Sequence, residues 1–175
     1  MGKANTNTKT KALTIKAENI ISKAQFQDFC KNVINLQTDF AVFKTSRASA
    51  LYQVEPKRDL ALKIIAYFGY SYDTELTNII ELKGELIRYV VKAKVWKGDR
   101  QATGLGLATN KEKSSGTPGR EDHDAIGRAE TRSLKRAVEG LSGLPIINQL
   151  IEHYFNGYKI RPEKLKELGL SAYLN

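Results

Sequence analysis

The stretch Leu86–Thr109 constrains the fold of this chain more than any other. Between Ile87 and Val95 apolar and polar residues alternate, which is the period of a β-strand with one buried face. The tripeptide Lys97-Gly98-Asp99 is typical of a tight hairpin turn, and the strand-like run Gln101–Thr109 follows it. Because the connection is so short, the two strands are expected to be antiparallel neighbours.

A third strand-like run, Tyr72–Leu82, precedes this hairpin. It stops at Lys83-Gly84, so its connection to the next strand is also short. The segment Phe40–Val54 mixes aromatic and β-branched residues with Ser and Arg, and we interpret it as strand or irregular structure. These patterns together predict an antiparallel meander.

Helical periodicity is found on both sides of the predicted meander. Ser22 is a candidate N-cap of an amphipathic helix. Pro56 suits the first turn of a second helix, which Gly69 ends. The strongest pattern spans Glu121–Leu141 and has acids in its first turn, which complements the helix dipole. The predicted fold class is α+β: an antiparallel β-meander of three to four strands with a long helix packed across it and flanking helices.

The 175 residues suit one compact domain with tails. Residues 1–12 are polar and basic, as in a flexible tail. Residues 13–143 carry the strand and helix patterns. Residues 144–175 form a C-terminal segment, and Pro145 starts its predicted helix. Its apolar residues exceed the needs of a lone helix and make it a candidate subunit interface: Ile146, Ile147, Leu150, Ile151 and Tyr154.

The charge balance favours a polyanion as partner. Lys and Arg number 28 against 19 acids, for a net charge of +9 and a pI near 9.6. Composition alone does not choose between DNA, RNA and an anionic membrane face. No apolar run is long enough to span a membrane, and the N-terminus lacks the apolar stretch of a secretory signal. With Cys30 as the single cysteine, we expect a cytoplasmic protein.

The predicted helix Glu121–Leu141 carries much of this charge on one side. On a helical wheel its apolar residues occupy one half. The opposite sector is almost purely cationic and holds Arg128, Arg132, Lys135 and Arg136. Few acids alternate with these cations, which disfavours an ordinary face of i,i+4 ion pairs, and Glu139 is the exception. Glu130 falls on the apolar half, where we expect it to bond an arginine or backbone amides.

The strand Leu86–Trp96 adds further cations on its polar face. These are Arg88, Lys92 and Lys94, together with Trp96, a candidate for base stacking. Tyr52 is a second aromatic candidate, and burial is an equally open interpretation for both rings. We expect the helix sector and this strand face to line a single groove.

Enzymatic alternatives find less support. The cluster Glu121–Asp124 contains three acids and one histidine, but successive helical side chains point about 100° apart and rarely converge on one metal ion. The element Gly104-Leu105-Gly106 lacks the third glycine of a dinucleotide site. Cys30 and His153 are far apart in sequence and lack a third group for a nucleophilic dyad. An architectural protein that binds duplex DNA or RNA stays open.

The string AETRSLKRAVEGLSG, Ala129–Gly143, resembles the annealing domain of the Rad fifty-two superfamily, which includes a eukaryotic recombination mediator and phage annealing proteins. Leu134–Val138 stands at the place of the family's conserved basic core on this helix. Gly104-Leu105-Gly106 is similar to its GYG element, and Arg58–Tyr70 is similar to its helix with a Phe-Gly-aromatic end. The resemblance covers roughly residues 56–143.

The resemblance implies that residues 13–143 are an annealing-type DNA-binding domain. It implies single-stranded DNA as the partner, with duplex DNA as a further candidate, and annealing in recombination or repair without catalysis, metal or cofactor. It assigns contacts with the DNA backbone to Lys135 and Arg136. This chain has Glu139 where the family often has another arginine. The resemblance also implies a homo-oligomer, a ring or open helix, in a prokaryotic nucleoid or encoded by a virus. The full predicted DNA-binding set is Arg88, Lys92, Lys94, Arg128, Arg132, Lys135 and Arg136.

Overall fold

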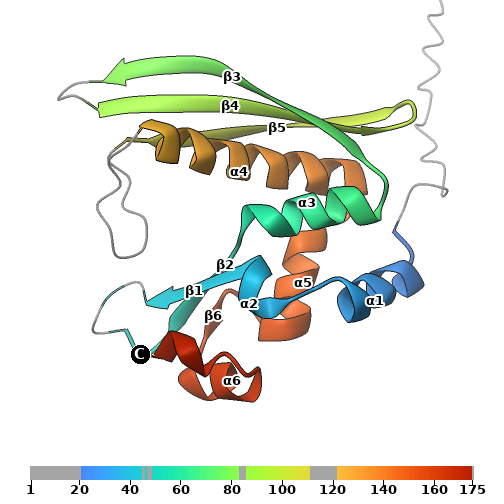
Figure 1. Cartoon of the computed structure of the whole chain (residues 1–175), viewed down its shortest axis with the longest axis vertical. Helices are drawn as coiled ribbons and strands as arrows, with labels where there is room; N and C mark the ends of the chain where they lie inside the picture. Colours follow the sequence, from blue (N-terminus) through green and yellow to red (C-terminus); the bar gives the residue numbers. More distant parts are fainter. Residues whose placement is uncertain (1–20, 45, 47–48, 83–85, 111–121, 175) are drawn as a thin grey trace, which may run out of the picture.

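The computed structural model describes residues 21–44, 46, 49–82, 86–110 and 122–174. The strands are β1 (Phe40–Lys44), β2 (Tyr52–Pro56), β3 (Ser71–Leu82), β4 (Leu86–Lys97), β5 (Arg100–Thr109) and β6 (Lys159–Ile160). The helices are α1 (Lys23–Asn32), α2 (Leu36–Asp39), α3 (Arg58–Tyr67), α4 (Asp122–Ser142), α5 (Ile146–Phe155) and α6 (Pro162–Glu167). Within the described ranges the strands form two antiparallel sheets, ordered β1-β2-β6 and β3-β4-β5. Figure 1 shows α4 lying between them. The predicted α+β class, with a long helix across a meander, is confirmed.

The meander β3-β4-β5 has the predicted topology. Val95 pairs with Ala102 across the tight turn, where Gly98 adopts a positive φ of 55°. Side chains of β4 alternate between buried and exposed along the strand. A β-bulge interrupts the pairing of β3 with β4 between Leu76 and Asn78.

Helix α4 packs against the face of the meander that β4 and β5 share, and it lies unusually close to β5. A Cβ atom built on Gly106 would lie 1.7 Å from the carbonyl oxygen of Ala129, and one built on Gly104 would lie 2.2 Å from that of Ser133. Only glycine permits such an approach. The glycines that resemble a family motif therefore have a packing role here.

The second sheet and the remaining helices enclose the larger core. Phe29 of α1, Phe40 of β1 and Phe155 of α5 are all at most 1% exposed. Within this core lie the apolar residues predicted to serve a subunit interface, where Ile146, Ile147, Leu150 and Ile151 are at most 3% exposed and Tyr154 is half-buried. The four isoleucine and leucine side chains pack within the chain and are not exposed to a partner. Strand β6 also joins the C-terminal segment to β2, through Tyr52 and Ile160.

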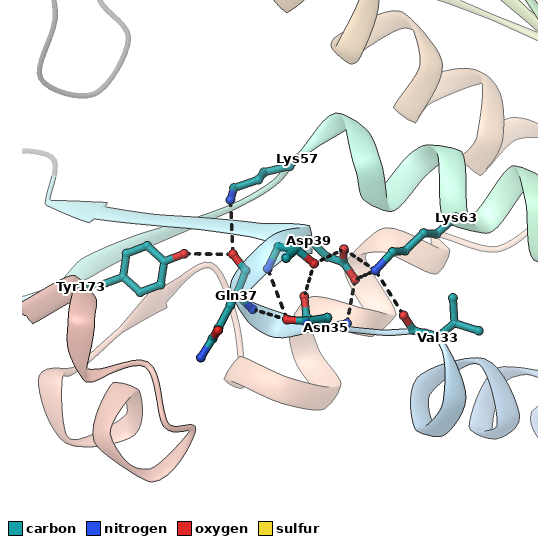
Figure 2. Close-up of polar contacts among 8 residues, drawn as sticks. Val33, Asn35, Gln37, Asp39, Lys57, Lys63 and Tyr173 are labelled. Atoms are coloured by element: carbon teal, nitrogen blue, oxygen red, sulfur yellow. Dashed lines mark hydrogen bonds and ion pairs between the residues drawn. The ribbon is translucent and has the colours of Figure 1, made fainter.

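A buried polar cluster fixes α2 to α3 (Figure 2). The carboxylate of Asp39 is fully buried and pairs with the Lys63 ammonium at 2.8 Å. It also accepts hydrogen bonds from the backbone N–H of Asn35 at 2.8 Å and from the Thr38 hydroxyl at 3.0 Å. The Lys63 ammonium donates as well to the carbonyl of Val33, at 3.3 Å. These contacts compensate the cost of burying a carboxylate.

Two of the local predictions at helix ends are confirmed and one is wrong. Ser22 caps α1 by accepting from the Gln25 amide at 3.2 Å, and Gly69 follows α3 with a positive φ of 64°. Pro56 does not begin α3, because it is the last residue of β2, and α3 starts two residues later, at Arg58. None of the helices within the described ranges is long and apolar enough to cross a membrane. The predicted tail 1–12 lies outside the described residues.

Candidate nucleic-acid interface

Three arginines of α4 reach the free edge of β5. Each donates a hydrogen bond from its guanidinium to a main-chain carbonyl oxygen of that strand. The pairs are Arg128 with Thr109 at 3.3 Å, Arg132 with Leu107 at 2.5 Å, and Arg136 with Leu105. We call these three residues the arginine ladder.

The spacing of the ladder follows from the two repeats involved. Four residues of an α-helix advance by about 6.0 Å. Two residues of an antiparallel strand advance by about 6.8 Å. The helix runs antiparallel to β5, so arginines at every fourth helical position meet carbonyls at every second strand position. Because β5 is an edge strand of its sheet in the part of the chain that the structure describes, these bonds satisfy carbonyls that do not pair with another described strand.

An open cavity of about 590 Å³ lies between α4 and the hairpin formed by β1 and β2. Five cations line it: Lys57 and Arg58 from the β2–α3 junction, and Arg128, Arg132 and Lys135 from α4. Two carboxylates, Glu55 and Asp124, also line it. We call this cavity the basic cavity. Cations thus outnumber acids in it and converge from two segments of the chain.

Lys135 is a half-buried cation of the basic cavity. Desolvation lowers its pKa from 10.5 to about 8, and the charge on Arg132 acts in the same direction. Glu55 and Glu139 act in the opposite direction, because their negative charges favour the ammonium form. An anionic oxygen in the cavity would supply a further counter-charge for this partly desolvated ammonium.

Arg128 is incompletely satisfied. Its terminal nitrogen belongs to the ladder, yet its Nε atom is buried and has no hydrogen-bond partner among the described residues. An unpaired buried donor is unfavourable. Because this Nε atom is buried, it is not accessible to a ligand in the basic cavity, and its missing partner is a local cost of the packing.

Glu139 is not part of the cavity wall. Burial raises the pKa of its carboxyl, while a hydrogen bond from the Asn148 backbone and the charge on Lys135 favour the ionised form. The carboxylate therefore faces the start of α5. Its charge nevertheless acts on Lys135, whose ammonium form it favours, so Glu139 affects the basic cavity without lining it.

Glu130 has the role that its position on the wheel predicts. Its Oε1 atom accepts hydrogen bonds from Arg58 at 2.7 Å and from the Thr74 hydroxyl at 3.2 Å. The prediction that this carboxylate bonds an arginine is confirmed. Through Arg58, the pair joins α4 to the start of α3 at the border of the basic cavity.

The cations of β4 do not join this cavity. Arg88, Lys92 and Lys94 are exposed and alternate with the buried residues Tyr89, Val91 and Ala93, which face α4. The three cations therefore lie on the sheet face opposite α4. The expectation of one groove lined by helix and strand is wrong, because the sheet separates the two sets.

The two aromatic candidates also lie outside the basic cavity. Trp96 is half-buried on the outer face of β4, and the Lys94 ammonium lies 5.6 Å from its ring centroid. Tyr52 is only 4% exposed and belongs to the core. Its burial excludes base stacking by this ring in the folded chain.

The alternative enzymatic sites are only partly within the described residues. Glu121 and the side chains of Asp122 and His123 lie outside them, and Asp124 lines the basic cavity. Among the described residues no group of three His, Cys, Asp or Glu side chains is placed to hold a metal ion. Cys30 and His153, although distant in sequence, line a common cavity of about 270 Å³. Burial raises the pKa of the Cys30 thiol, which disfavours the nucleophilic thiolate.

Lys57 and Arg58 are the cavity residues that the sequence prediction missed. The adjacent basic pair was visible after Pro56, but no local pattern says that this junction folds beneath α4. The pair is brought close to Lys135 by the long-range packing of the two sheets around the helix.

No protein-family model and no curated protein sequence matches this chain, so the assignment of function depends on the basic cavity and its geometry.

Proposed function

We propose that this chain binds single-stranded DNA along the basic cavity and promotes the pairing of complementary strands. The observation that carries the proposal is the convergence of Lys57, Arg58, Arg128, Arg132 and Lys135 on one open cavity. Cations at this density favour phosphates, because each neutralised phosphate releases condensed counterions. The resemblance of residues 56–143 to an annealing domain supports the same assignment.

The mechanism is electrostatic. Backbone phosphates lie along the cations of α4, at the wall that the arginine ladder holds in position. The carboxylate of Glu55 lies on the opposite wall and repels phosphates, so the strand is kept toward the helix. None of the described residues that line the cavity is aromatic, so the bases are not stacked on side chains and stay free to pair with a second strand. The proposed activity requires no bond cleavage and no cofactor.

Charge reversal at Lys135 tests the binding site. Lys135→Glu should weaken binding of a labelled oligothymidylate at least about tenfold at low salt, and should make the salt dependence less steep. Fluorescence anisotropy measures both quantities. The matched control is Lys166→Glu on α6, an exposed position outside the cavity lining that undergoes the same charge change. Equal losses in the two variants would mean that net charge, and not the cavity, determines binding.

Annealing needs a separate assay. The rate at which two complementary labelled oligonucleotides form a duplex should rise when the protein is added, and the Lys135→Glu variant should not produce this increase. Binding without acceleration would favour a protective or architectural role. Competition with duplex DNA and with RNA of the same sequence distinguishes the preferred ligand.

The resemblance also leads us to propose a homo-oligomer, acting in the cytoplasm. The mass in solution, with and without an oligonucleotide, tests this part. A monomer under both conditions would contradict the oligomer while leaving DNA binding unaffected.

A further inference from the structure

Strand β3 is an edge strand whose inner face is left partly uncovered. Helix α4 packs mainly against β4 and β5, and Figure 1 shows β3 at the far edge of the sheet. Three large apolar side chains of β3 are therefore exposed on the face that carries the helix: Tyr72 at 42%, Leu76 at 42% and Ile79 at 54%. Exposed apolar side chains on one face of an edge strand are typical of an interaction surface, although Thr74, which bonds Glu130, lies between Tyr72 and Leu76.

The two edges of this sheet differ in their capacity to accept another strand. The arginine ladder occupies carbonyls along the β5 edge. Among the described residues strand β3 pairs with β4 alone, and it contains neither the lysine nor the proline that commonly protects an edge. Its bulge follows Leu76, so Ser71–Leu76 is a regular six-residue edge.

The chemistry of this edge specifies its partner. Asp73 and Glu75 lie on the outer face, opposite Lys94 and Lys92 of β4. The Asp73 carboxylate also accepts a hydrogen bond from the Thr74 main-chain N–H at 2.8 Å, and an incoming strand would have to displace or share this contact. Strand β3 carries no cation at all, although the whole chain has a net charge of +9. The outer face thus offers two acids at alternate positions. The inner face of the same six residues offers Tyr72 and Leu76.

We propose that the Ser71–Leu76 edge binds an extended segment of a partner protein in which basic and apolar residues alternate. Such a segment adds to the sheet as a fourth strand by main-chain hydrogen bonds. Because side chains of a strand alternate between faces, its basic residues lie beside Asp73 and Glu75, while its apolar residues cover Tyr72 and Leu76. This surface is separate from the basic cavity. The β3 edge binds a cation-rich peptide, whereas the basic cavity binds a polyanion.

A synthetic peptide tests the inference on the full chain. The probe is an acetylated peptide of alternating lysine and valine, KVKVKVK, and the control is KKKKVVV, which has the same composition but cannot segregate its side chains by face. Titration should show at least about tenfold tighter binding of the alternating peptide. Amide hydrogen exchange should slow in β3 when that peptide is bound. Equal binding of both peptides, or unchanged exchange in β3, would overturn the proposal.

Substitutions in the chain separate the edge from general electrostatics. The double variant Asp73→Asn, Glu75→Gln should bind the alternating peptide about tenfold more weakly. The matched control, Glu152→Gln with Glu163→Gln, removes two exposed acids elsewhere and should leave its affinity unchanged. If β3 is already protected from exchange without peptide, and more so at higher chain concentration, a second copy occupies the edge and the proposal fails.

Discussion

The Nη1 atom of Arg132 on α4 donates a hydrogen bond to the carbonyl oxygen of Leu107 on β5, at 2.5 Å. A residue predicted from charge alone to contact phosphates therefore also fastens its helix to a sheet edge. The same guanidinium lines the basic cavity. Stability and ligand binding are consequently coupled at this position, and substitutions can separate them.

Arg132→Ala should lower the free energy of unfolding by about 1 kcal/mol, because the ladder loses one charge-assisted hydrogen bond at an exposed site. Arg132→Lys should lose similar stability but keep most of the affinity for oligothymidylate, since lysine retains the charge without the planar fork. Urea denaturation and anisotropy measure the two effects. A lysine variant as stable as the parent would show that the fork geometry is unimportant.

Gly106→Ala should destabilise the fold by about 3 kcal/mol or more, because the added methyl group would meet the backbone of α4 at Ala129. Gly127→Ala provides the opposite case. A Cβ there meets nothing within 4 Å, and alanine in a helix is favoured over glycine by about 1 kcal/mol. Thermal and chemical denaturation of the two variants should therefore give changes of opposite sign.

Affinity for oligothymidylate should decline as the pH rises through about 8, because the Lys135 ammonium loses its proton with a pKa of about 8 in the free chain. Bound phosphate favours the ammonium form and shifts this midpoint upward. Lys135→Arg should remove the decline, since arginine stays charged throughout. The same pH dependence in both proteins would assign it to another group.

The same pKa has a consequence for stability with a defined sign. Below about pH 8 the folded and unfolded chains both hold the proton, and the folded chain bears the cost of burying the ammonium. Between about 8 and 10.5 only the unfolded chain keeps it, so the contribution of Lys135 to stability rises with pH. The difference between the parent and Lys135→Met should follow this course in urea denaturation at pH 7 and pH 9.

Lys63→Met should destabilise the chain by about 3 kcal/mol, because it leaves the buried carboxylate of Asp39 without its counter-charge (Figure 2). Adding Asp39→Asn to that variant should recover part of the loss, since a neutral amide is less costly to bury. Chemical denaturation of the two single variants and the double variant gives the coupling energy. Additive effects would contradict the pairing of the two residues.

Local patterns in the sequence were sufficient to predict the meander and its main helix. Alternation over Leu86–Trp96 and the Lys97-Gly98-Asp99 turn determine which strands pair, and both are confirmed by the register of β4 with β5. The predicted helix Glu121–Leu141 differs from α4 by one residue at each end. These elements are recognisable because each has a long, regular period and a short connection.

The second sheet was beyond local prediction. Strand β6 has only two residues, and it pairs with β2 across more than a hundred positions of sequence. No period can be read from two residues, and no turn signal joins segments so far apart. The basic cavity depends on this packing, so its Lys57 and Arg58 wall was missed together with the sheet.

The placement of the β4 cations was, by contrast, present in the sequence. Arg88, Lys92 and Lys94 alternate with Tyr89 and the apolar positions that follow it, so the two sets must lie on opposite faces. An amphipathic helix covers the apolar face. The cations of the strand were therefore bound to lie away from that helix, and the prediction of one shared groove disregarded this parity.

The arginine ladder also restricts how the gene for this chain can change in length. A one-residue insertion between Leu105 and Gly106 would shift the carbonyls of Leu107 and Thr109 against their arginines and turn Gly106 away from α4. Insertions are compatible with the ladder only as pairs in β5 that are matched by about four residues in α4. Homologues of different length in these two elements should therefore vary in this two-to-four ratio.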